Sequence, residues 1–166
     1  FLSDDDRITE DLLSMVCQAC TKGECVGILI DAQVMNENNH VVIPTLSNIQ
    51  TDGPLLLEDK HLETMYKWST LISSIVVRSD LAKSNIEIVE KALGTLFIQL
   101  PIFWLSCLGE KILLINSFKI KKYIAKKSYF ETSVFDVWLW NLIDVGRVLE
   151  KGGIPKSVIK NAQCNI

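Results

Sequence analysis

"ALGTLFIQLPIFWLSCLG", residues 92–109, is the stretch that decides the predicted fold. It carries no charged residue, and it stands between Lys91 and Glu110. A run of this kind is either a short membrane span or the buried centre of a globular domain. As a helix it measures about 27 Å at about 1.5 Å per residue, slightly less than the roughly 30 Å hydrocarbon core of a bilayer. Length alone therefore leaves both interpretations open.

Two residues inside the run favour the buried interpretation. Gln99 places an amide at its centre, and Pro101 removes a backbone donor where a spanning helix needs one. The segments on both sides are amphipathic, so they need an apolar partner to pack against. We therefore expect residues 92–109 to form a core segment that kinks at Pro101 and ends at Gly109, and we expect no membrane insertion.

Working outward from this segment, apolar residues recur at helical spacing over most of the chain. The predicted helices cover residues 4–22, 58–78, 84–100, 101–108, 110–127 and 134–150, with a short terminal helix after Pro155. The pattern predicts a mainly α fold, a compact bundle of six or seven helices around segment 92–109. We expect one helical domain over residues 1–166.

Residues 26–46 are the exception to the helical pattern. Val26–Val34 and Val41–Leu46 are rich in β-branched residues, and Asn36–Asn39 between them are typical of a turn. This pattern predicts a small β-hairpin. A helix over residues 24–35 is the alternative.

Charge is divided unevenly along the chain. Residues 1–66 hold twelve acidic and three basic residues, whereas residues 67–166 hold eight acidic and fourteen basic residues. The lysines concentrate in residues 111–127, where no acid occurs. On a helix Lys119, Lys122 and Lys126 would share a face. With Lys121 and Lys127 they could contact nucleic acid or another anionic surface. The alternatives are a solvated face and attraction to the acidic half.

The last long predicted helix, residues 134–150, is apolar on more than one face. Trp138 and Trp140 are two residues apart, so they point in different directions and cannot both enter one core. An apolar helical face left open by the core is typical of a protein interface. We take Phe135, Trp138, Trp140 and Val145 as the candidate interface, and the alternative is that they belong to the core.

Five cysteines, an odd number, predict a reducing compartment, either cytoplasm or nucleus. Cys17, Cys20 and Cys25, followed by His40, have a spacing that zinc ligands can adopt, but the first two lie on a predicted amphipathic helix. A cysteine nucleophile would need one of the two histidines beside it. Neither pattern is complete, so we expect no metal, no cofactor and no catalytic residue.

These observations rank three functions. The first is a non-enzymatic regulatory domain, viral or eukaryotic in composition, that binds a protein partner or a second copy through an apolar helical face. The second is a nucleic-acid or anionic-surface binder that uses the 111–127 lysines. The third is a cysteine-dependent enzyme.

Overall fold

The computed structural model describes residues 6–46, 52–92, 94–95, 97–123 and 140–164. It contains both helices and strands, and its six strands form a curled mixed sheet in the shape of a half-barrel. The predicted mainly α bundle is therefore wrong, because the chain has an α/β fold.

The elements are as follows. The strands are β1 (Asp6–Arg7), β2 (Gly27–Met35), β3 (Val41–Ile43), β4 (Gly53–Leu56), β5 (Ile75–Val77) and β6 (Lys111–Tyr123). The helices are α1 (Glu10–Lys22), α2 (Leu62–Ser69), α3 (Ser79–Ser84), α4 (Ile86–Val89), α5 (Gln99–Cys107), α7 (Asn141–Lys151) and α8 (Lys156–Cys164). Short 3₁₀ turns lie at Asp59–His61, Ile72–Ser74 and Glu90–Ala92.

Two long parallel strands, β2 and β6, form the centre of the sheet. Near their beginnings, antiparallel β5 adds to β2 and antiparallel β4 adds to β6. Near their ends, β3 adds to β2 and β1 adds to β6. The register between β2 and β6 shifts between these halves, where Asp31 alone lies opposite the four residues 116–119 of β6. This bulge divides the sheet into two halves.

The strand β6 replaces the helix predicted over residues 110–127. Ile112 and Leu114 belong to the core cluster on one side of the sheet, and Ile115 belongs to the cluster on the other. A parallel strand with both faces covered reads as a nearly continuous apolar run, which is hard to distinguish from a buried helix. For the same reason the sequence pattern did not distinguish β5 from the end of the helix predicted over 58–78.

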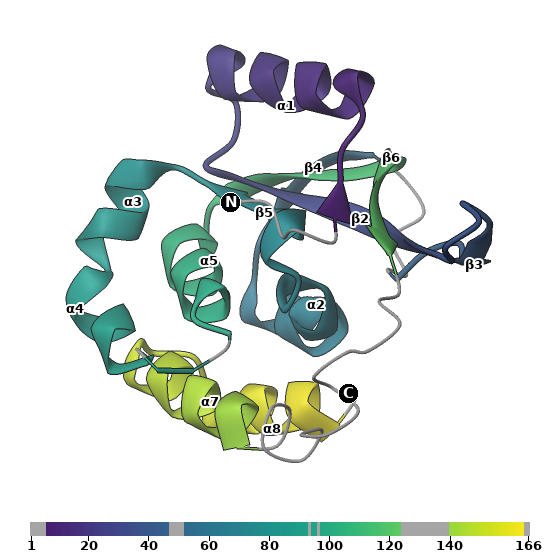
Figure 1. The fold of residues 1–166 in the computed structure, drawn as a ribbon. Helices are drawn as coiled ribbons and strands as arrows, with labels where there is room; N and C mark the ends of the chain where they lie inside the picture. Colours follow the sequence, from purple (N-terminus) through teal and green to yellow (C-terminus); the bar gives the residue numbers. More distant parts are fainter. Residues whose placement is uncertain (1–5, 47–51, 93, 96, 124–139, 165–166) are drawn as a thin grey trace.

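Helices cover the sheet unequally (Figure 1). α1 lies on one face, where Leu12 packs with Ile28, Ile30 and Ile115. α2 and α5 lie on the other face, and α7 and α8 form a further layer beyond them. The larger core cluster therefore lies between the sheet and this helical layer.

Segment 92–109 contains α5, and its predicted burial is confirmed for seven of the nine residues of this helix. Leu100, Phe103 and Trp104 are fully buried in the larger cluster. The Trp104 Nε1–H donates to the Ser69 hydroxyl oxygen at 2.9 Å, so the indole enters the core with its polar group paired. None of the helices in the described ranges is both long and apolar enough to cross a membrane.

The hairpin predicted over residues 26–46 is confirmed, since β2 and β3 pair antiparallel. β2 is longer than a small hairpin requires, because it is also a central strand. The first helix begins at the Thr9 cap and not at residue 4, and it ends at Gly23 as predicted, with a φ of 65°. The terminal helix after Pro155 is also confirmed.

Candidate interaction surface

The turn that joins β2 to β3 is built by asparagine side chains. Oδ1 of Asn36 accepts the backbone N–H groups of Asn38 at 3.0 Å and His40 at 2.9 Å. Asn39 adopts a φ of 60°, a left-handed conformation that asparagine tolerates better than most residues. This turn chemistry fixes the hairpin, which extends past the helical layers (Figure 1).

β3 carries three consecutive β-branched apolar residues that remain on the surface. Val41, Val42 and Ile43 are 49%, 52% and 42% exposed, although Val34 and Met35 on the paired strand are buried. No Asp, Glu, Lys or Arg occurs from Asn38 to Leu46. Isolated exposed apolar residues are ordinary, but a run of three on one edge strand forms a patch that water solvates poorly. We call these three residues the β3 patch.

The base of β3 is held by a polar network around Asp31. Its side chain is almost entirely buried, at 2% exposure, and its Oδ2 lies 3.1 Å from Nζ of Lys119. The Thr45 hydroxyl donates to the same oxygen at 2.6 Å, and the Lys119 ammonium also donates to the Pro44 carbonyl at 2.8 Å. The network joins β2, the bulge of β6 and the residues that follow β3. It therefore fixes the direction in which the hairpin extends.

A second carboxylate, that of Asp52, closes the bulge from its other side. Its Oδ1 accepts the N–H groups of Asn116 at 2.6 Å and Ser117 at 2.8 Å, and its Oδ2 accepts the Ser117 hydroxyl. Burial raises the pKa of Asp52, but these three hydrogen bonds outweigh it and hold the pKa below its ordinary value. At the bulge the N–H groups of Asn116 and Ser117 do not pair with β2, and the Asp52 carboxylate accepts them instead.

The predicted lysine site lies on a strand and not on a helix. Alternation along β6 sends Lys121 to one face of the sheet and Lys122 to the other, so a shared helical face for Lys119, Lys122 and Lys126 is wrong. Lys119 serves the Asp31 network. Lys126 and Lys127 lie outside the described residues.

The residues of the predicted apolar interface on the last long helix do not lie together on the surface. Trp140 is 60% exposed at the start of α7. Val145, one and a half turns later, is fully buried in the larger core cluster, so it is removed from the candidate interface. Phe135 and Trp138 lie outside the described residues. Sequence reasoning placed Val41–Ile43 in a strand but missed their exposure.

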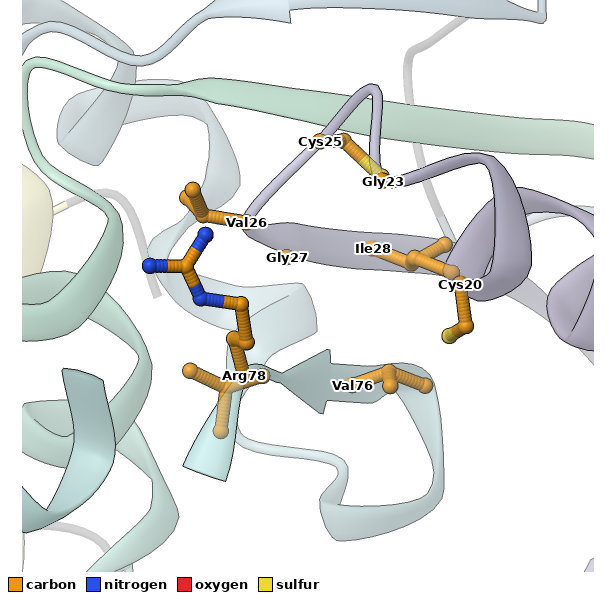
Figure 2. A pocket seen from close by; sticks show the side chains of 9 residues that line it. Cys20, Gly23, Cys25, Val26, Gly27, Ile28, Val76 and Arg78 are labelled. Carbon is orange, nitrogen blue, oxygen red and sulfur yellow. The ribbon is translucent and has the colours of Figure 1, made fainter. Parts of the chain in front are cut away.

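Two cysteines line a small cavity of about 110 Å³ between the end of α1 and β5. Figure 2 shows Cys20 and Cys25 at this cavity, with Val76 and Arg78 on its other side. Burial raises the pKa of the Cys25 thiol, and the neighbouring Cys20 raises it further. At neutral pH Cys25 is therefore a protonated thiol, which is a poor nucleophile and a poor metal ligand.

The zinc pattern suggested by spacing is not assembled in the described part of the chain. Cys17 and Cys20 are exposed on α1, and the described residues contain no group of three or more side chains suited to hold a metal ion. His61 uses Nδ1 to accept the Glu58 backbone N–H at 3.0 Å. In comparisons with known proteins, the chain matches no family model and no curated protein.

Proposed function

We propose that this chain is a non-enzymatic protein-interaction domain that contacts its partner through the β3 patch. The observation that supports the proposal is the exposure of Val41, Val42 and Ile43 on a hairpin whose base is held by the Asp31–Lys119 ion pair. Covering half-exposed valine and isoleucine side chains yields roughly 25 cal/mol for each Å² of apolar surface removed from water. A fixed apolar surface of this kind binds with little loss of conformational entropy. Trp140 is also exposed, as the sequence-based interface proposal requires of this residue.

The alternative of a polyanion binder is less well supported by the described lysines and arginine. Lys119 is paired with buried Asp31. The Arg7 guanidinium lies 5.1 Å from the centre of the Tyr123 ring, and Lys122 lies directly opposite Asp6 in the sheet. A phosphate group would have to compete with these intramolecular contacts, so it would gain less from each charge than from a freely solvated lysine.

The alternative of a cysteine enzyme is opposed by the state of the buried thiols. Burial raises the pKa of Cys107 to about 12, and it also raises the pKa of Cys25. A nucleophilic cysteine needs the opposite shift. We also infer an intracellular location, in cytoplasm or nucleus, because Cys17, Cys20 and Cys164 are exposed free thiols, which persist best in a reducing compartment.

The proposal is tested by affinity capture from cells with three tagged proteins, the wild type, Val42→Lys and Leu13→Lys. Leu13 is a matched control because it is 49% exposed and lies on α1, away from the hairpin. We expect wild type and Leu13→Lys to retain a common set of proteins by quantitative mass spectrometry, and Val42→Lys to lose them. Equal recovery with all three proteins contradicts the proposal.

A further inference from the structure

We propose that the protein partner of this chain places a carboxylate side chain between Arg7 and Lys121, on the sheet face that also carries Val41 of the β3 patch. This inference rests on the proposed function and names the chemistry of the partner. Three observations support it: the strand register puts the two cations side by side, neither cation has an acidic partner within the described residues, and an apolar row of side chains lies next to them.

Two cations lie directly opposite each other where β1 pairs with β6. Arg7 and Lys121 are register partners, and residues directly opposite each other in a sheet project their side chains from the same face. Gln33 of β2 is the partner of Lys121 on its other side and continues this row with an uncharged amide. Like charges placed directly opposite each other repel. The row therefore concentrates positive charge at a place where the fold itself gains nothing from it.

Within the described ranges, no carboxylate pairs with either cation. The described ion pairs involve other residues, and neither Arg7 nor Lys121 has a further hydrogen bond or ion pair of its side chain. Lys119, by contrast, is paired with the buried carboxylate of Asp31. An anion that binds between Arg7 and Lys121 would relieve their mutual repulsion without displacing a carboxylate of the described chain.

The Tyr123 ring orients the guanidinium of Arg7. The Arg7 Cζ lies over this ring, 5.1 Å from its centre, and the Tyr123 hydroxyl donates to Oδ1 of Asn39 at 2.8 Å. The ring covers one face of the guanidinium, whereas the N–H groups point outward in the guanidinium plane. Two of them can donate to one carboxylate while the ring contact is kept. Arg7 is therefore held in an orientation that suits a carboxylate.

An apolar row lies next to the cationic row on the same face. Tyr123, Met35 and Val41 are register partners across β6, β2 and β3, and Tyr123 follows Lys121 by two residues. Val41 is 49% exposed. Side chains two positions apart on an extended strand are separated by about 7 Å. An extended partner segment with an acidic residue and, two positions later, an apolar residue would therefore match both rows. A nucleic acid would meet no cation in the second row, so a protein segment fits better.

The inference is tested by NMR titration of the isotope-labelled protein with two synthetic peptides. One is acetyl-Thr-Glu-Thr-Val-Thr-amide, and the other has Gln in place of Glu. We expect the Glu peptide to cause saturable shift changes at the side-chain Nε–H of Arg7 and at the backbone N–H of Lys121. The Gln peptide should bind at least about tenfold more weakly, because it lacks the charge-assisted hydrogen bonds. The difference should shrink as salt screens the charges.

Substitutions in the protein locate the site. Arg7→Gln and Lys121→Gln should each weaken binding of the Glu peptide by about tenfold. Lys111→Gln should bind it like the wild type, and it is a matched control because Lys111 is an exposed lysine at the beginning of the same strand. Arg7 and Lys121 have no described acidic partner to lose, so both variants should keep the wild-type fold, which far-UV circular dichroism checks.

Three results would overturn the inference. The first is equal binding of the Glu and Gln peptides, or no saturable shift at about 10 mM of the Glu peptide. The second is unchanged binding of the Glu peptide to Arg7→Gln and Lys121→Gln. The third is a short oligothymidylate that binds more tightly than the Glu peptide and displaces it, since the site would then serve a nucleic acid. None of these results depends on Val42, so the capture experiment with Val42→Lys decides the proposed function separately.

Discussion

Replacing Lys119 with methionine would leave the carboxylate of Asp31 buried without its cation. The Asp31 side chain is 2% exposed, and the Lys119 side chain is 22% exposed. Methionine has a similar length but no charge and no donor, so it removes the 3.1 Å ion pair and the 2.8 Å bond to the Pro44 carbonyl together. Breaking a buried pair from one side typically costs about 3–5 kcal/mol. Because Lys119 is partly exposed, we expect Lys119→Met to lower the free energy of unfolding by about 2–3 kcal/mol.

The measurement is a double-mutant cycle by urea unfolding. Asp31→Asn keeps Oδ1 as the acceptor for the Ala32 N–H, and its Nδ2 can donate to the Thr45 hydroxyl oxygen, so combined with Lys119→Met it leaves no unpaired buried charge. The double variant should therefore be at least about 1 kcal/mol more stable than the sum of the single losses predicts.

Lys121→Met is the matched control for this cycle. Lys121 lies two residues further along β6, directly opposite Arg7, so its loss removes a like-charge neighbour. Lys121→Met should change the free energy of unfolding by no more than about 0.5 kcal/mol. If Lys119→Met costs no more than Lys121→Met, or if the two changes are additive, the Asp31 network does not hold the base of β3.

Four further outcomes follow from the packing. Because the folded state lowers the pKa of Asp52, its contribution is complete at neutral pH, above the ordinary carboxyl range, and is lost as pH falls through that range to the lowered pKa. Urea unfolding should therefore show a smaller acid-induced loss of stability for Asp52→Asn than for the wild type. Gly27→Ala should cost about 1–3 kcal/mol in the same assay, because its Cβ would lie 2.6 Å from the Cys107 sulfur. Trp104→Phe should cost about 1–2 kcal/mol beyond its lost volume, because the bond to Ser69 disappears. The buried Cys107 thiol, with its pKa raised to about 12, should react with a maleimide only after unfolding, whereas the exposed cysteines react at once.

Local chemistry was a reliable guide wherever one residue decides the outcome. Gly23 ends α1, Asn36–Asn39 form the turn, and seven of the nine residues of α5, which lies in the charge-free run, are buried. Each of these features follows from a short segment, because it depends on a cap, a left-handed φ or mean hydropathy. Sequence periodicity did not identify a strand whose two faces are both buried. In β6 the apolar residues face both core clusters, so no alternation remains to identify a strand.

The candidate surface was missed for a related reason. The exposure of Val41–Ile43 depends on what lies above them, and no helix of the described chain covers that end of the hairpin (Figure 1). Val145 shows the opposite error, since an apolar residue on a helix that looked open is packed in the core. Hydropathy reports that a residue favours burial. Only the arrangement of distant elements decides whether it finds a place in the core or stays on the surface.

In this hairpin the residues that stabilise the fold differ from the residues proposed to bind a partner. The two proposals can therefore be tested separately. The Asp31 network acts on the fixed base of β3, where each polar group has a partner inside the chain. The β3 patch lies beyond that base, and its side chains are about half exposed. Replacing Val42 should therefore change binding with little change in unfolding free energy. Replacing Lys119 should lower the unfolding free energy first and weaken binding only as the direction of the hairpin is lost. A Val42→Lys protein that unfolds as easily as Lys119→Met would show that the patch belongs to the core in solution, and the interaction surface would then have to lie elsewhere.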